Sequence, residues 1–213
     1  MRTLFREFVL LIIVFSPTIG GLVFYHQLPD TMATHFGADN EVNDTMSKQM
    51  TILVFTIIGL VPILFPLMRR FEQRQIKDAK FILAIHVSRY CLALLLAIAG
   101  WSILTYNLGY SLDIRRIVFI AVGVLFLVIG NYLGIIKPNN VMGFRTPWAL
   151  RDDENWRKTH RLGGPVMVIG GLIILVATFL PVCVSIFIFF GTMASVFFVP
   201  ISYSFMMFKR KRH

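Results

Sequence analysis

The chain has 213 residues, of which 56% are hydrophobic and only 15% charged, and its mean hydropathy is +0.72. A water-soluble domain of this length cannot bury so much apolar surface, so the composition excludes an ordinary soluble protein and predicts one that lies in a lipid bilayer. The formal net charge of +10 then has to be explained by where the basic residues stand along the chain.

Six apolar stretches are long enough to cross a hydrocarbon core of about 30 Å, which takes roughly 20 residues of helix. In chain order they are residues 8–25, 51–68, 81–106, 117–136, 165–181 and 183–208. Lipid offers the backbone no hydrogen-bond partners, so each stretch is expected to be a helix. The predicted fold class is an all-α polytopic membrane protein with six transmembrane helices.

The basic residues predict the orientation of these helices, because Lys and Arg accumulate in cytoplasmic loops. With both termini inside, the cytoplasmic side receives Arg2, Arg6, Arg69, Arg70, Arg74, Lys77, Lys80, Lys137, Arg145, Arg151, Arg157, Lys158, Arg161 and the terminal run from Lys209 to Arg212. The other side receives only Lys48, Arg115 and Arg116. The terminal "KRKRH" is then an anchor to anionic membrane lipids, without direct nucleic acid binding.

Some residues within the spans carry expectations of their own. Gly130 and Gly134, like Ala93 and Ala97, have the spacing at which small residues let helices pack closely. Arg89 lies near the cytoplasmic end of the third span, with His86 beside it. An arginine there can extend to the membrane surface, so we interpret it as an interfacial anchor.

The segment from Tyr25 to Gln49 is the polar part of the predicted outer side. Its Asn, Asp and Gly residues favour a turn after a short extended piece, which predicts a compact extracellular loop. His26, His35 and Asp39 are candidate metal ligands, since imidazole and carboxylate groups bind divalent ions. Their spacing matches no established metal site, so a structural loop that contacts an outside ligand is the favoured interpretation.

The segment "GFRTPWALRDDENWRKTHRLGG", from Gly143 to Gly164, is the polar part of the predicted inner side. Thr146 and Pro147 are typical of a helix start, and the Gly-Gly-Pro at residues 163–165 is typical of a stop. A short interfacial helix is expected between the fourth and fifth spans. Trp148 and Trp156 are about two turns apart and would share its membrane-facing side. The segment is either a lipid anchor or a docking platform for a cytoplasmic protein.

His160 is the residue of this segment that would suit general base catalysis. A catalytic assignment also needs a nucleophile or a metal within reach, and the only hydroxyl groups nearby in sequence belong to Thr146 and Thr159. The sequence therefore gives no support for catalysis, and we expect no cofactor.

The run "NYLGIIKPNNVMGFRTPWALRDDENWRKTHRLGG", Asn131 to Gly164, resembles the signature of the SdpI family, through "NYLG", "KPN", "RTPW", a later Trp and a Thr-His followed by Gly-Gly. Upstream, "LPDTMATHFGADNEVNDTMSK" resembles the small membrane domain of unknown function that often precedes this signature. The resemblance implies a two-helix domain over residues 1–70, with an extracellular loop at 26–50. It also implies a four-helix domain over 71–213, with a cytoplasmic signature loop at 137–164.

What the resemblance implies about function is a multi-pass protein of the bacterial cytoplasmic membrane that protects its producer from a secreted toxin peptide. Such a protein can also signal, by drawing a winged-helix autorepressor to the membrane. The residues expected to face the toxin are Leu28, Pro29, Asp30, His35, Phe36 and Asp44. The residues expected to bind the cytoplasmic partner are Arg145, Thr146, Pro147, Trp148, Trp156, Arg157, Thr159 and His160.

Two other classes of function remain open from the sequence. A membrane-embedded metal-dependent enzyme would use His26, His35 and nearby acids, and bound metal in the purified protein would favour it. A peptide transporter or channel would need a water-lined cavity between the helices.

Overall fold

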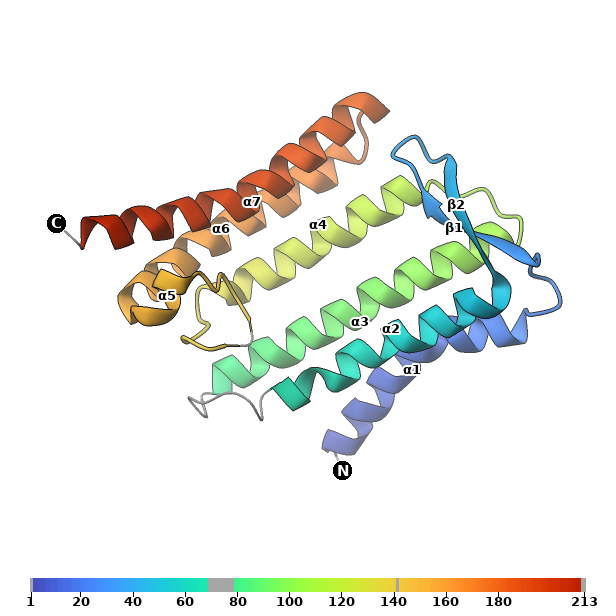
Figure 1. Cartoon of the computed structure of the whole chain (residues 1–213), viewed down its shortest axis with the longest axis horizontal. Helices are drawn as coiled ribbons and strands as arrows, with labels where there is room; N and C mark the ends of the chain where they lie inside the picture. Colours follow the sequence, from blue (N-terminus) through green and yellow to red (C-terminus); the bar gives the residue numbers. More distant parts are fainter. Residues whose placement is uncertain (1, 69–78, 141, 212–213) are drawn as a thin grey trace. The chain divides into compact units, whose positions relative to one another are not determined.

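The computed structural model describes residues 2–68, 79–140 and 142–211 (Figure 1). In chain order its elements are α1 (Arg2–Val23), β1 (Thr31–Phe36), β2 (Val42–Ser47), α2 (Lys48–Met68), α3 (Ala79–Asn107), α4 (Ile114–Leu133), α5 (Pro147–Arg151), α6 (Asp153–Ala177) and α7 (Val182–Arg210). Four residues of the basic segment between α2 and α3, Arg69, Arg70, Arg74 and Lys77, lie outside the described residues.

The six predicted spans all fall on helices, and the membrane fold is confirmed. Five of them, α1, α3, α4, α6 and α7, are long and apolar enough to cross a bilayer, and α2 adds a shorter apolar stretch at Lys48–Leu64. The protein is thus a multi-pass membrane protein. The fifth span differs in its start, because α6 begins at Asp153 and continues through Gly163, Gly164 and Pro165.

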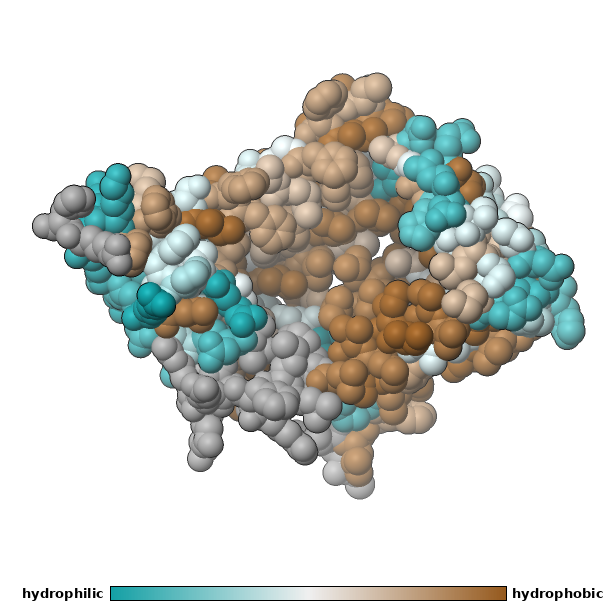
Figure 2. Space-filling model, in the orientation of Figure 1, coloured by the Kyte–Doolittle hydropathy of each residue, from teal (hydrophilic) through white to brown (hydrophobic). Residues whose placement is uncertain are grey.

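The surface of the helices agrees with a lipid environment. Large apolar side chains are widely exposed, including Phe187 at 81% and Phe198 at 67%, which water would penalise and hydrocarbon would not. Figure 2 shows this apolar surface in brown along the helices, with hydrophilic surface over the β1–β2 hairpin and around α5.

The described residues form two compact units. Unit 1 consists of residues 1–65 and 89–121, and unit 2 consists of residues 66–88 and 122–213. Unit 1 contains α1, the hairpin, most of α2 and one part each of α3 and α4. Unit 2 contains the remaining parts of α2, α3 and α4 together with α5, α6 and α7. The division at residue 70 that the resemblance implies concerns sequence regions and stays a prediction.

Unit 1 has its core between α1, α2 and α3. Leu10, Val14 and Ala93 are buried together, as the small side chain of Ala93 predicts for a close helix contact. Nearer the hairpin, the indole N–H of Trp101 on α3 donates to the Ser16 hydroxyl on α1, at 3.0 Å. This side-chain partner satisfies an indole N–H that lipid could not.

Arg89 does not extend to the membrane surface, so its interpretation as an interfacial anchor is wrong. Its residue is only 2% exposed, and its guanidinium makes two hydrogen bonds, of 2.8 and 2.6 Å, to the Glu7 carboxylate on α1. Its Nε–H also donates to the Pro62 carbonyl on α2, at 2.6 Å. That carbonyl needs an outside donor, because the residue four positions on is Pro66, which has no N–H. Arg89 thereby joins three helices.

Unit 2 is packed through glycines where α4 meets α6. A Cβ on Gly130 would lie 2.9 Å from the Gly164 carbonyl oxygen, and a Cβ on Gly171 would lie 2.7 Å from the Gly123 carbonyl oxygen. Both distances are too short for a real side chain, so only glycine permits this approach of the two backbones. The expectation for Gly130 is confirmed, whereas at Gly134 an added Cβ would make only ordinary contacts.

Candidate functional site

The segment between α1 and α2 folds into an antiparallel hairpin, which gives the predicted extended piece and turn a defined form. Thr31 pairs with Ser47 at its base and Phe36 with Val42 near its tip, and His35 lies opposite Asp44. The register shifts on both sides of His35, with Thr34 as the extra residue in β1 before it and Asn43 as the extra residue in β2 after it. Asn40 has a φ of 71° in the turn, a left-handed conformation that asparagine tolerates well.

Two asparagines attach this hairpin to the rest of unit 1. The carboxamide of Asn107, at the end of α3, accepts from the Ala33 N–H at 2.8 Å and donates to the Ala33 carbonyl at 2.9 Å, as a neighbouring strand would. Asn40 accepts from the Ile114 N–H at the start of α4 and donates to the Leu112 carbonyl. The hairpin is thus fixed at its first strand and at its turn.

The base of the hairpin is held by Lys48. Its ammonium lies 2.9 Å from the Asp30 carboxylate and 4.5 Å from the centre of the Tyr25 ring. The hydrogen bond from Lys48 lowers the pKa of the Asp30 carboxyl below its usual value. Leu28 is buried with Met32 and Leu104 beneath this point.

The residues predicted to face the toxin divide into two groups. Pro29, Asp30, His35 and Asp44 are exposed, whereas Leu28 is 4% exposed and Phe36 packs edge-on against Tyr106. A ligand at the hairpin can therefore touch the first group and not the second. Within the described residues, no three His, Cys, Asp or Glu side chains are placed to hold a metal ion, so His26, His35 and Asp39 are not brought together as a ligand set.

The predicted inner segment is divided by a break at Asp152. Thr146 caps the five-residue α5 by accepting from the Ala149 N–H, with Pro147 in its first turn. Asp152 is extended, with φ −138° and ψ 108°, and caps α6 by accepting from the Glu154 N–H. The prediction that Trp148 and Trp156 share one face of one short helix is therefore wrong, because they lie on different helices.

Trp156 and His160 form the centre of a buried cluster in unit 2. The two rings are stacked with their centres 4.1 Å apart, and both residues are 0% exposed. The indole N–H donates to the Ile136 carbonyl at 2.8 Å. The Phe144 N–H donates to His160 Nε2 at 2.9 Å, so that nitrogen carries no proton, and Nδ1 donates to the Trp156 carbonyl at 2.9 Å.

Gly143 completes this cluster from the loop before α5. Its φ is +103°, and a Cβ there would collide with His160 Nε2. Glycine is thus required both by the backbone conformation and by the space that the imidazole occupies. Earlier in the same loop, Asn139 is 1% exposed and its side chain accepts from the Met142 N–H and donates to the Lys137 carbonyl.

A second buried network joins α6 to α7. Asn155 donates to the Ser204 carbonyl at 2.9 Å, and its side-chain oxygen accepts from the hydroxyls of Ser204 and Thr159, at 2.6 and 3.1 Å. The Ser204 hydroxyl lies 3.2 Å from that of Thr146. Since Ser204 uses its proton on Asn155, Thr146 is the donor in this last contact. The N-cap of α5 is thereby connected to α6 and α7.

The residues predicted to bind a cytoplasmic partner therefore have different surroundings. Trp156, Thr159 and His160 are 0% exposed, while Arg145, Pro147 and Arg157 are exposed. Trp148 is half-buried between the rings of Phe205 and Phe208 on α7, and its indole N–H is buried without a partner among the described residues. Only the exposed members and part of Trp148 can touch another protein in this conformation.

The end of α7 lies against the start of α6. The Lys211 ammonium is 2.7 Å from the Asp152 carboxylate and 2.8 Å from that of Glu154. The hydrogen bond to Asp152 raises the pKa of Lys211, and the bond from Lys211 lowers that of Asp152. By contrast, the exposed guanidinium groups of Arg145, Arg151, Arg157 and Arg161 form no ion pair with a carboxylate of the described residues. These four arginines are available to an anionic surface.

The geometry does not suit His160 for catalysis. Both ring nitrogens are engaged with backbone groups, and the hydroxyl groups of Thr146 and Thr159 bond to Ser204 and Asn155 instead. A general base needs a free nitrogen within reach of a substrate. The histidine is a structural member of the cluster.

Sequence reasoning missed Asn155, Ser204, Asn107 and Asn139. Asn107 and Ser204 stand between aromatic or apolar residues, and polar side chains among apolar ones in a membrane protein need partners, whereas Asn139 and Asn155 have polar neighbours in sequence and carry no such signal. That signal points to burial with hydrogen bonds, but it does not identify the partners, which lie as far as 74 residues away for Asn107.

Comparison with known proteins agrees with the sequence resemblance. Residues 135–204 match the SdpI/YfhL protein family, and residues 12–60 match a domain of unknown function, DUF1648. The chain is similar to the immunity protein SdpI of Bacillus subtilis (strain 168), with 28% identity over 174 residues, which cover 82% of each chain. No solved structure shows significant similarity to this chain.

Proposed function

We propose that this chain, whose residues 135–204 match the SdpI/YfhL protein family, is an immunity protein of the bacterial cytoplasmic membrane, which protects its producer from a secreted membrane-active peptide. The observation that carries this proposal is the similarity to a named immunity protein along 82% of both chains. A stretch of 174 among 213 residues must overlap both the DUF1648 region and the SdpI/YfhL region, so the similarity is not confined to one motif.

The hairpin supports a role in contacting the peptide. It is fixed to unit 1 by Asn40 and Asn107, and it presents His35 and Asp44 side by side on exposed surface. A rigid contact surface loses little conformational freedom on binding, which favours affinity. The orientation predicted from the basic residues puts this hairpin outside the cell, where a secreted peptide arrives.

The α5 segment is the candidate for the second role, recruitment of a winged-helix autorepressor. Arg145, Pro147 and Arg157 supply exposed contacts, and anionic lipid competes for the same guanidinium groups. The buried residues Trp156, Thr159 and His160 then act by holding the shape of this surface. Toxin binding would signal by changing that shape or its accessibility.

Neither alternative class receives the same support. The relative is an immunity protein, not an enzyme, and the described His and acidic side chains form no metal-binding group. A transporter needs a polar pathway, whereas the cavity of unit 1 between α1, α2, α3 and the hairpin is lined mainly by apolar side chains.

The test of the immunity proposal is survival. The chain is expressed in a sensitive bacterium, which is exposed to the mature peptide encoded beside its gene, and membrane abundance is measured in the same cells. We expect the killing curve to shift to higher peptide concentrations. An unchanged curve at confirmed abundance would contradict the proposal.

Recruitment is tested with Arg145→Lys and Trp148→Ala in a reporter assay for peptide-dependent derepression. A docked arginine makes planar bidentate contacts that lysine cannot copy, so Arg145→Lys should reduce induction. If the arginine only binds anionic lipid, its charge alone matters, and Arg145→Lys should leave induction unchanged. Arg116→Lys, at an exposed position near the start of α4, is the matched control. Full induction by both variants at normal membrane abundance would rule out docking at this segment.

A further inference from the structure

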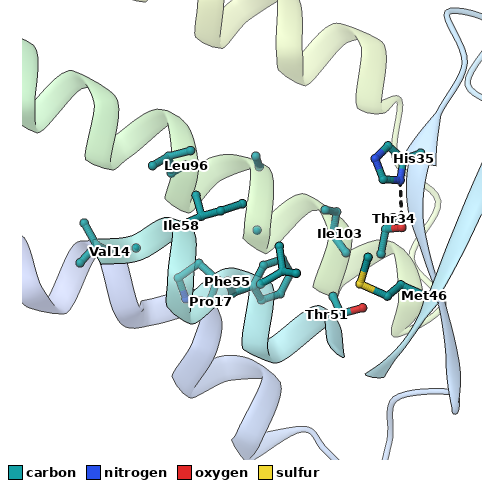
Figure 3. A pocket seen from close by; sticks show the side chains of 14 residues that line it. Val14, Pro17, Thr34, His35, Met46, Thr51, Phe55, Ile58, Leu96 and Ile103 are labelled. Atoms are coloured by element: carbon teal, nitrogen blue, oxygen red, sulfur yellow. Dashed lines mark hydrogen bonds between the residues drawn. The ribbon is translucent and has the colours of Figure 1, made fainter. Parts of the chain in front are cut away.

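Unit 1 contains a cavity of about 200 Å³ next to the hairpin (Figure 3). Its walls come from α1, α2 and α3, with Val14, Pro17, Phe55, Ile58 and Leu96 among them. Thr34, His35 and Met46 belong to the hairpin and stand at one end, as Figure 3 shows, with Val14 and Leu96 toward the other. The cavity thus extends from a polar hairpin into an apolar helix bundle.

The interior of this cavity suits an apolar group. The Thr51 hydroxyl donates to the Ser47 carbonyl, and the Thr34 hydroxyl lies 3.1 Å from His35 Nδ1, so both hydroxyl groups at the wall already have partners. An apolar cavity of about 150 Å³ is enough to bind benzene and stays dry when empty. The unit 1 cavity therefore has room for one aromatic or branched aliphatic side chain.

The hairpin around the cavity is anionic. Asp44 lies opposite His35 in the strand register, and Asp39 and Glu41 follow in the turn. None of these three carboxylates pairs with a lysine or arginine of the described residues, and residues 26–47 contain no lysine or arginine. Arg115 and Arg116 follow the Ile114 that Asn40 of the turn bonds, and they share the single carboxylate of Asp113. The three hairpin carboxylates therefore outnumber the single net positive charge that these arginines and Asp113 carry beside them, and the field at this surface favours cations over anions.

We propose that this cavity is a binding site for an apolar side chain of a cationic peptide, whose basic residues contact the hairpin carboxylates. The proposal rests on the proposed immunity function and specifies the chemistry of the toxin: a peptide that carries a large apolar residue next to positive charge. An acidic peptide and an anionic lipid headgroup are both disfavoured, because the carboxylates of Asp39, Glu41 and Asp44 repel them.

Two kinds of substitution test the two halves of this site. Ala99→Phe on α3 and Val54→Phe on α2 fill the cavity from different walls. Ile98→Phe is the matched control, since Ile98 is 41% exposed and is not among the cavity residues. Asp44→Asn removes one charge and keeps the oxygen that accepts from the Thr45 N–H.

Binding is measured with the full chain in nanodiscs of phosphatidylcholine. Cys91→Ala and Cys183→Ala remove the native thiols, and Thr45→Cys on the exposed strand carries an environment-sensitive fluorophore. The probes are a synthetic peptide of alternating lysine and leucine blocks and a second peptide with glutamate in place of lysine. Empty nanodiscs give the signal from lipid alone.

We expect saturable binding of the lysine peptide to the parent chain and to Ile98→Phe. The dissociation constant should rise about tenfold or more in both filled variants, which corresponds to one buried apolar side chain. It should rise about two- to fivefold in Asp44→Asn, with the difference lost at high salt. The thermal unfolding of each variant in detergent shows that the two filled chains are folded.

Equal affinity for the lysine and glutamate peptides would overturn the proposal, as would unchanged affinity in both filled chains. A lipid that copurifies with the parent chain and is absent from Ala99→Phe, while peptide affinity stays the same, would identify the cavity as a lipid site and also overturn it. Failure of this proposal can be distinguished from failure of the immunity proposal. If Ala99→Phe protects cells as well as the parent chain does, only the binding site is contradicted. If the chains bind the peptide but none of them protects cells, only the immunity function is contradicted.

Discussion

Gly143 and His160 illustrate how single residues determine the shape of the α5 segment. The imidazole accepts a hydrogen bond from the Phe144 N–H and stacks on Trp156, and it takes up the space that any side chain at position 143 would need. The histidine thus organises the loop before α5 through its size and its neutral, Nδ1-protonated form. Replacing either residue should affect folding before it affects any contact with a partner.

Gly143→Ala is therefore expected to destabilise the chain more than a comparable substitution elsewhere. Gly109 is the matched control, because its φ is +94° and a Cβ there would meet nothing within 4 Å. Gly109→Ala should cost about 1–2 kcal/mol for its left-handed backbone. Gly143→Ala should cost about 1–3 kcal/mol more through overpacking against His160. Thermal unfolding in detergent measures both, and equal losses would show that His160 does not fill this space.

Asn107 gives a second prediction at the scale of one residue. Asn107→Ala removes the acceptor of the Ala33 N–H, so we expect faster hydrogen exchange at Ala33 and its neighbours in β1. The loss should be about 1 kcal/mol, the net value of a typical hydrogen bond. Asn43→Ala, on exposed β2, is the control and should leave exchange in β1 unchanged. Unaltered protection in Asn107→Ala would mean that the hairpin is held in another way.

The helices show which parts of the fold sequence reasoning can predict. The spans were predictable because a long apolar run has one stable structure in lipid, and all six lie on helices. The start of α6 was not predictable. Gly163, Gly164 and Pro165 are typical of a helix end, but Gly164 packs on the Gly130 carbonyl and Phe144 covers Gly163, so tertiary contacts keep the helix continuous. Local propensity is a weak guide where packing decides.

The candidate site was predictable only in part for a similar reason. The motif located the right segment, and Thr146 caps α5 as its sequence indicates. Burial of Trp156, Thr159 and His160 was not predictable, because the same residues suit an interfacial helix equally well when their neighbours on α7 and in the 137–146 loop are unknown. Ser204 provides two contacts with Asn155 from 49 residues away.

Arg89 connects α1, α2 and α3, and this connection can be tested by substitution. Arg89→Met removes the donor to the Pro62 carbonyl and the guanidinium that bonds to Glu7, at a cost of about 3 kcal/mol. Pro66→Ala restores a backbone N–H that can reach Pro62. The loss caused by Arg89→Met should then be smaller by about 1 kcal/mol in the Pro66→Ala chain. Thermal unfolding of the parent chain, the two single variants and the double variant measures these losses. If the loss in the double variant equals the sum of the two single losses, the proposed role of the Pro62 carbonyl is excluded.

For the whole molecule, the open structural prediction is its orientation. The basic residues place the hairpin outside and the α5 segment inside. This orientation can be tested by labelling a single cysteine on each side of the membrane. Asn155 is 1% exposed and the Asn40 side chain bonds to the Ile114 N–H, so neither position is suitable for the cysteine. Ala38→Cys and Arg151→Cys, both at exposed positions, are suitable in a chain without Cys91 and Cys183.

An impermeant thiol reagent on intact cells should react with Ala38→Cys at once and with Arg151→Cys only after permeabilisation. The reverse pattern would invert the molecule and place the hairpin beyond the reach of a secreted peptide.

Immunity itself is tested most directly by membrane depolarisation. Sensitive cells are loaded with a potential-sensitive dye and titrated with the purified peptide encoded beside the gene. The comparison is between cells with this chain and cells with an unrelated multi-pass protein at equal abundance. We expect depolarisation to require a peptide concentration at least about tenfold higher when the chain is present, which corresponds to about 1.4 kcal/mol of protection. Coincident titration curves, with the chain folded and in the membrane, would contradict it.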